Sequence, residues 1–191
     1  MFNPVEYFER DVAPVAVQLA KPQKVTNEMP SAMIGSGTQP IAVLTDDPVT
    51  EELIKYSVGR LGGETVVFRD LISGIHKIIR EPSNFSHVII KLNDEARYDQ
   101  EYLHAVKLLR SRSLRMFREK DACLPIAIMS DQVEEAPKNQ SATIYCDASF
   151  GNVRGYRDLV KLLSVSWFSC RNWLMEFRRA NPSFVQSPKR G

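Results

Sequence analysis

Five short apolar runs, of the kind that form buried β-strands, recur along this 191-residue chain between segments with helical spacing. The runs are IAVLTDD at 41–47, TVVFRD at 65–70, SHVIIKLN at 86–93, LPIAIMSD at 124–131 and ATIYCDAS at 142–149. Strands without a polar face must be covered on both sides, and helices between successive strands supply that cover. The sequence therefore predicts an α/β fold with a parallel sheet.

Four of the intervening segments have helical spacing. They are PVTEELIKYSVGRLGGE at 48–64, LISGIHKIIRE at 71–81, DQEYLHAVKLLRSRSLRMFRE at 99–119 and GYRDLVKLLSVSWFSCRNWLMEF at 155–177. Gly62-Gly63 is expected to stop the first helix, and its inward face is expected to carry Val49, Leu53, Tyr56 and Leu61. The segment 132–141 between the last two runs predicts a short helix or none. The final helix should extend past Trp173.

Prolines and a Gly-Ser-Gly divide the amino-terminal part from the rest. We interpret residues 1–39 as an arm or linker, 40–177 as one domain and 178–191 as a tail. The arm is either a leader without a packed core or a segment that docks on this or another chain, since it carries scattered apolar side chains. Both possibilities remain open at this stage.

The charge and cysteine content exclude several classes of protein. A net charge of +2 does not indicate a nucleic-acid or membrane partner. The amino terminus carries acids where a signal peptide has a basic flank, so a cytoplasmic protein is expected. The three cysteines are an odd number, and two lie in or beside apolar runs, which predicts core thiols rather than a disulfide framework.

The histidines and the basic residues are expected to serve structure rather than chemistry. His76, His87 and His104 lie on different predicted elements and lack metal-ligand spacing, so no metal site is expected. The basic residues of 107–120 spread over several faces of a helix, which favours a solvated surface over an anion or nucleic-acid site.

In open parallel sheets, ligands bind beyond the carboxyl ends of the strands, at the switch point between the first and third strands. The residues that decide function are expected there. They follow the first strand (Thr45, Asp46, Asp47), the third (Lys91 to Glu95), the fourth (Ser130, Asp131) and the fifth (Cys146 to Ser149).

Three motifs resemble the receiver (CheY-like) family of response regulators, in particular short single-domain regulators of the phytochrome-associated type. They are VLTDDPVTEEL, LPIAIMSD and VKLLSVSWFSCRNWL, and the resemblance covers about residues 40–175. It implies a flavodoxin-like, five-stranded parallel sheet with strand order 2-1-3-4-5, with the arm before it and an extended final helix after it.

Receivers of this family bind Mg²⁺ through acids after the first strand and phosphorylate an aspartate after the third. They sense the phosphoryl group with a hydroxyl residue and clamp it with a lysine. The resemblance places these roles, intact or replaced, on Thr45, Asp46, Lys91, Ser130, Tyr145 and Ala148. Asp46 matches an acid, Thr45 replaces its acidic neighbour, Ser130 matches the hydroxyl and Tyr145 the aromatic switch position. Lys91 replaces the acceptor and Ala148 the clamping lysine.

These replacements predict that phosphoryl transfer is lost. A lysine cannot be the phosphoacceptor, and Mg²⁺ prefers a set of oxygen ligands that this pocket no longer offers, so no metal and no cofactor are expected. Lys91 either pairs with Asp46 or Asp47, in place of the metal ion, or extends into solvent. The Asp46-Asp47 pair before Pro48 also fits a helix cap.

The hypothesis is therefore a non-catalytic, receiver-like regulatory protein that acts through protein–protein contacts. A flavodoxin-like enzyme or nucleotide-binding protein, and an atypical but active phosphoreceiver, are the alternatives. The resemblance implies a histidine kinase or an output protein as partner. The aromatic residues Trp167, Phe168 and Trp173 predict a homodimer interface on the final helix, unless the arm of the same chain covers them.

Overall fold

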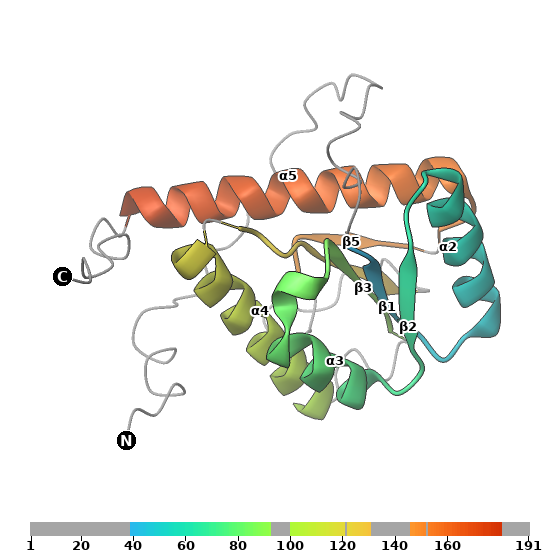
Figure 1. Ribbon diagram of the computed structural model, residues 1–191, viewed down its shortest axis with the longest axis horizontal. Helices are drawn as coiled ribbons and strands as arrows, with labels where there is room; N and C mark the ends of the chain where they lie inside the picture. Colours follow the sequence, from blue (N-terminus) through green and yellow to red (C-terminus); the bar gives the residue numbers. More distant parts are fainter. Residues whose placement is uncertain (1–38, 93–99, 121, 131–145, 152, 181–191) are drawn as a thin grey trace.

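The structure is a computed structural model that describes residues 39–92, 100–120, 122–130, 146–151 and 153–180 (Figure 1). The described part is a single sheet with helices on both faces. The arm at 1–38, the tail at 181–191 and the expected short helix at 132–141 lie outside the described residues.

The sheet has five parallel strands in the order β2-β1-β3-β4-β5, as predicted. Its central strand, β3, is in register with both neighbours, because Ile41 of β1 lies opposite His87 and Ile126 of β4 lies opposite Val88. The strands are β1 (Ile41–Leu44), β2 (Thr65–Phe68), β3 (His87–Leu92), β4 (Ile126–Ser130) and β5 (Ala148–Phe150).

Two helices cover each face of the sheet, as Figure 1 shows. On one face α3 and α4 pack against Leu44, Ile90 and Ile128, and on the other α2 and α5 pack against Val43, Ile89 and Met129. These strand residues are almost fully buried, as expected for strands without a polar face. The helices are α2 (Pro48–Arg60), α3 (Leu71–Arg80), α4 (Gln100–Lys120) and α5 (Tyr156–Ala180), with a 3₁₀ turn η1 at Pro82–Asn84.

Helix α2 ends as expected but turns a different side to the sheet. Gly62 has φ +75°, and the amide of Gly63 donates to the Val58 carbonyl at 3.1 Å, a glycine-dependent helix end. The prediction was wrong for Val49 and Tyr56, which are 74% and 66% exposed. The buried stripe is centred instead on Ile54 and Val58, one helical turn apart, and Leu53 and Leu61 lie at its margins.

Of the predicted fifth run, residues 142–145 lie outside the described residues, and only its end lies in a strand. β5 begins at Ala148, and Cys146 and Asp147 form a bend before it. At this bend the Asp147 amide donates to the Ile126 carbonyl, and the Asp147 carboxylate accepts from the Ile126 amide, each at 2.7 Å. The Asp147 carboxylate thus accepts the hydrogen bond of the Ile126 amide, which a strand neighbour would otherwise take. Regular pairing of β4 with β5 begins one residue later, between Ala127 and Ala148. Ala148 therefore lies at the amino end of β5 and not at its carboxyl end.

The second halves of α4 and α5 share a small hydrophobic cluster of their own. Leu114, Cys170 and Leu174 are buried there, and Phe117, Cys123, Trp173 and Phe177 pack against them. Because of this cluster, α5 continues to Ala180, past Trp173 as predicted, and in Figure 1 it runs along the whole width of the molecule. Within the described residues, no helix has the length and apolar character needed to cross a membrane.

Candidate functional site

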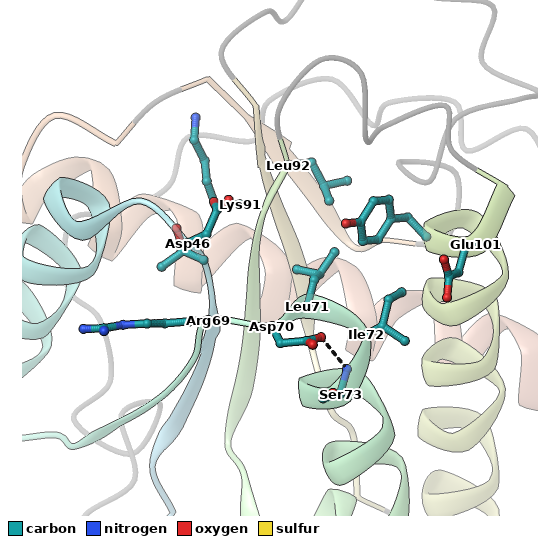
Figure 2. Close-up of a pocket in the computed structure, with 11 residues that line it drawn as sticks. Asp46, Arg69, Asp70, Leu71, Ile72, Ser73, Lys91, Leu92 and Glu101 are labelled. Carbon is teal, nitrogen blue, oxygen red and sulfur yellow. Dashed lines mark hydrogen bonds between the residues drawn. The ribbon is translucent and has the colours of Figure 1, made fainter.

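A pocket of about 590 Å³ lies at the carboxyl ends of β1, β2 and β3 (Figure 2). This is the switch point where the sequence predicted a site. The turns after β1 and β2, the end of β3 and the first turns of α3 and α4 form its walls. The lining residues are Thr45, Asp46, Arg69, Asp70, Leu71, Ile72, Ser73, Lys91, Leu92, Glu101 and Tyr102.

The turn after β1 divides its two acids between two roles. The Asp47 carboxylate accepts hydrogen bonds from the amides of Val49 and Thr50, at 3.0 and 3.2 Å, and caps α2. The Thr50 hydroxyl also donates to it, and this bond contributes most to lowering the pKa of Asp47. The capping role predicted for the pair is confirmed for Asp47, whereas Asp46 is exposed and lines the pocket.

Thr45 holds this turn in place. Its side chain is buried, with 2% of its surface exposed, and its hydroxyl oxygen accepts a hydrogen bond from the Asp47 amide at 3.1 Å. A receiver would carry an acid at this position according to the resemblance. Here the side chain is used to shape the backbone, so Asp46 is the acid of this turn that faces the pocket.

Lys91 is the penultimate residue of β3 and belongs to the same wall of the pocket as Asp46. Its side chain is half-buried, and in Figure 2 it projects from the end of the strand, away from Asp70 and Ser73. Its positive charge is one of the causes that lower the pKa of Asp47, after the hydrogen bonds from Thr50 and Val49. The charge of Lys91 therefore reaches Asp47, and a direct ion pair of Lys91 with Asp46 or Asp47 stays a prediction.

The wall formed after β2 was not predicted. Asp70 accepts a hydrogen bond from the Ser73 amide at 2.9 Å and caps α3, as Figure 2 shows. Arg69 points away from the other lining residues, and its Nε lies 3.2 Å from Glu51 Oε2 on α2. Lys55 and then Arg69 lower the pKa of Glu51. Arg69 and Asp70 end the run TVVFRD. The expectation that functional residues follow the carboxyl ends of the strands therefore applied to them as well.

The other predicted site residues are not all brought together. Ser130 ends β4 and is buried opposite Leu92, next to the pocket, but it does not line it. Ala148 is paired with Ala127 at the other edge of the sheet, so its assignment as the position of the clamping lysine is wrong. Tyr145 lies outside the described residues, as do Asp131 and 93–95.

The aromatic residues of α5 have different surroundings. Trp173 packs onto the domain itself, beside Phe177 and with the Arg110 guanidinium 5.4 Å from its ring centre. Trp167 is half-buried, and its ring centre lies 5.1 Å from the Arg171 guanidinium and 5.2 Å from the ring centre of the exposed Phe168. Trp167 and Phe168 are therefore in contact with each other, whereas Trp173 packs onto its own domain, and the interface itself stays a prediction.

A buried ion pair lies beyond the amino ends of β4 and β5. Arg110 Nη2 of α4 lies 2.8 Å from Asp147 Oδ2, and both side chains are almost fully enclosed. Burial raises the pKa of the Asp147 carboxyl, and the Arg110 charge acts against that rise. The prediction that the basic residues of 107–120 form a solvated surface is thus wrong for Arg110, which is buried because it has an acidic partner.

Comparisons with known proteins find similarity in structure but not in sequence. No protein-family model matches the chain, and no curated protein matches its sequence. A putative pilus assembly-related protein from Burkholderia pseudomallei aligns with a TM-score of 0.52 and 14% identity, over 69% of this chain and 91% of that one. A receiver domain from Methylobacillus flagellatus aligns with a TM-score of 0.48 and 19% identity, over 68% and 99% of the two chains. A response regulator from Burkholderia multivorans aligns with a TM-score of 0.48 and 16% identity, over 66% of this chain and 92% of that one.

The five-stranded parallel sheet in the order 2-1-3-4-5, with two helices on each face, defines the class: the chain has the flavodoxin-like α/β fold that CheY-like receivers also have. The fold that the resemblance implied is therefore confirmed by the sheet order itself. At these identities the fold carries no information about the chemistry of the pocket, which has to be argued from the residues that line it.

Proposed function

We propose that this protein is a receiver-like regulator that acts through contacts with other proteins and does not transfer phosphoryl groups. The observation that carries the proposal is the position of Lys91 at the end of β3, on the wall of the switch-point pocket beside Asp46. An aspartate in this place would be the acceptor of a receiver. An ammonium group cannot form an acyl phosphate.

The charge of Lys91 also opposes the metal ion that phosphoryl transfer needs. Mg²⁺ binds through oxygen ligands close to ideal octahedral geometry. Asp47 caps α2 and Asp70 caps α3, so both carboxylates already accept backbone hydrogen bonds. Asp46 is the acid after β1 that is left for a cation, and the ammonium of Lys91 already acts on that turn. We infer that Lys91 replaces the metal ion and holds the turn in one conformation.

The test is phosphorylation of the full chain. Purified protein is incubated with acetyl phosphate and Mg²⁺, and its intact mass is measured together with that of Lys91→Asp. We expect no phosphoryl adduct on the wild type. Calorimetric titration should detect Mg²⁺ binding to Lys91→Asp and none to the wild type. Lys161→Asp, an exposed change on α5, is the matched control and should behave as the wild type does. A phosphoryl adduct on the wild type would refute the proposal.

The pocket is also large enough for a small-molecule ligand, which is the alternative function. Its volume of about 590 Å³ lies in the range of ligand sites. A nucleotide- or flavin-binding protein with this fold would use the same crevice. Binding to the native state raises the melting temperature, so thermal shift with ATP, GTP and FMN separates the two functions. The regulatory proposal expects no change, and a saturable rise that is lost in Lys91→Ala would favour the ligand-binding protein.

For the contact surface we propose a homodimer through α5. Phe168 is 44% and Met175 40% exposed, and these residues are seven positions apart, so they lie on the same face of the helix. Trp167 flanks this face, whereas Trp173 contributes to the fold of its own chain. A two-fold axis would bring the same apolar pair together from both copies.

Light scattering tests the assembly. The full chain should have about twice the monomer mass of 21.7 kDa. Phe168→Asp combined with Met175→Asp should shift it to one monomer mass. The control is Tyr56→Asp, which alters an exposed aromatic side chain on α2 instead of α5. A wild type of monomer mass would contradict the dimer.

A further inference from the structure

All three cysteines of the chain converge on the buried ion pair at the amino ends of β4 and β5. Cys123 precedes β4, Cys146 precedes β5, and Cys170 lies on the inward side of α5. Arg110 Nη1 lies 3.9 Å from Cys170 Sγ, and Asp147 is next to Cys146 in the chain. The sequence predicted core thiols, and nothing in it indicated that three distant positions would meet.

Two of these thiols share one cluster. Cys170 is buried in the small cluster between α4 and α5, and Cys123 packs against that cluster. Each thiol is the largest cause of the pKa shift of the other, which places the two side chains within interaction distance. We propose that Cys123 and Cys170 form a peroxide-sensitive site that interconverts between two thiols and a disulfide.

The two thiols differ in the way that such a site requires. Cys123 is partly exposed and can be reached from solvent, whereas Cys170 is fully buried. The neighbouring Cys170 thiol lowers the pKa of Cys123, and the charge of Arg171 adds to this effect. The Cys123 thiol and burial raise the pKa of Cys170. Because the thiolate is the nucleophile, Cys123 attacks the oxidant and Cys170 resolves the product.

The steps balance with a peroxide as the oxidant. The Cys123 thiol first gives up its proton. The thiolate then attacks the hydroxyl oxygen of the peroxide, the O–O bond breaks and a sulfenic acid forms on Cys123, while the other oxygen takes up a proton, which replaces the one that Cys123 released, and leaves as water or an alcohol. Cys170 then attacks the Cys123 sulfur, the S–O bond breaks, and the sulfenic oxygen leaves as water with the proton of the Cys170 thiol. Two thiols are oxidised, one peroxide is reduced, and an external dithiol reverses the change.

Cys146 provides an internal comparison. Burial, followed by the charge of Asp147, raises the pKa of its thiol to about 12, so it has little thiolate at neutral pH. Within the described part of the chain, no group of three or more His, Cys, Asp or Glu side chains could hold a metal ion. The convergence of the three thiols therefore fits redox chemistry at one pair better than metal binding.

The first experiment uses the unmodified full chain. It is treated with hydrogen peroxide, the remaining thiols are alkylated in denaturant, and the peptides are mapped by mass spectrometry without reduction. We expect a Cys123–Cys170 cross-link, alkylated Cys146 and complete reversal by dithiothreitol. Before oxidation, native alkylation of Cys123 should be more than about tenfold faster than that of Cys146. A cross-link to Cys146, or equal alkylation rates, would overturn the proposal.

Variants separate the two roles. Cys170→Ser should accumulate a sulfenic acid on Cys123 that a dimedone probe traps. Cys123→Ser should give neither the adduct nor the cross-link, and Cys146→Ser should form the cross-link as the wild type does. Circular dichroism checks that each variant is folded. An adduct that forms on Cys170 in Cys123→Ser at the rate of the wild type would assign the nucleophile to the wrong cysteine and contradict the mechanism.

Discussion

Among single residues, His87 is one whose ionisation the fold opposes. It begins β3, and its side chain is buried between the sheet and α5, with Nε2 making no hydrogen bond among the described residues. Burial lowers the pKa of the imidazole to about 4, and a hydrogen bond to the Leu163 backbone acts in the other direction. The folded state therefore favours neutral His87.

The sign of the pH effect follows from this shift. The unfolded chain takes up a proton near the ordinary value of 6.5, and the folded chain does so only near 4. The stability is complete above the unfolded value and is lost as the pH falls from there towards the folded one. The lowered pKa of Asp47 does not act in this window, because it affects stability only below its ordinary value of 3.8.

We expect the free energy of unfolding to be about 2 kcal/mol lower at about pH 5 than at about pH 7.5. Urea denaturation at the two pH values measures this difference. In His87→Leu most of the difference should disappear, whereas the exposed His76→Gln should retain it. The same pH dependence in His87→Leu and the wild type would assign it to other groups.

Individual residues were predictable where a local rule applied. Asp47 caps α2 because it precedes proline at a helix start, and Lys91 reaches the pocket because it lies next to the carboxyl end of a central strand. The burial of Arg110 was not predictable, because its partner Asp147 is distant in sequence and approaches only when β5 joins β4. Helical spacing likewise did not indicate which side of α2 faces the sheet.

Among the elements, α3 lies close to the strands beneath it at Gly74. A Cβ atom on Gly74 would be 2.6 Å from Phe68 Cβ and 3.1 Å from Leu44 Cδ2. Phe68 Cβ is bound to the backbone of β2 and cannot move far by rotation. Glycine at this position thus permits the close approach of α3 to β1 and β2.

We expect Gly74→Ala to lower the free energy of unfolding by about 1–3 kcal/mol, although alanine favours a helix over glycine. Gly59→Ala in α2 is the matched control, since nothing lies within 4 Å of the added Cβ. It should raise the stability by about 0.4–1 kcal/mol. Chemical denaturation of both variants measures the pair. Stabilisation by Gly74→Ala would show that α3 can move away from β2.

The order of the elements was predictable because parallel strands without a polar face have a simple signature. The start of β5 was not, because YCDAS has the composition of a strand end but the carboxylate of Asp147 bonds to the backbone of β4 instead. The apolar pattern of the sequence does not reveal that the Asp147 side chain, and not the backbone of a neighbouring strand, accepts the hydrogen bond of the Ile126 amide.

At the scale of the whole molecule, the ion pair of Arg110 and Asp147 connects α4 to the bend before β5. We expect Asp147→Asn to lower the free energy of unfolding by about 3–5 kcal/mol, because it leaves a buried guanidinium without its counter-charge. The double variant Arg110→Met with Asp147→Asn should lose less than the sum of the two single changes. Additive losses, measured by urea denaturation, would show that the two charges do not stabilise each other.

The overall fold was predictable and the role of the pocket was only partly so. The composition of the strands predicts the sheet. The role of each charged residue at the pocket depends instead on which group it pairs with or hydrogen-bonds to. Glu51 holds Arg69, and the backbone of α3 holds Asp70, so residues of suitable type for a ligand already have structural roles. Such partners become visible only in three dimensions.

Helix α4 reaches from one end of the sheet to the other. Glu101 and Tyr102 in its first turn line the pocket, Arg110 at its middle contacts Asp147 and Cys170, and Leu114 near its end packs against α5. A tilt or shift of α4 would therefore move the pocket wall and the cluster that contains Cys123 and Cys170 together. If occupancy of the pocket changes the ease of oxidising Cys123, then oxidation must change the pocket's affinity by the same factor, because such coupling is reciprocal.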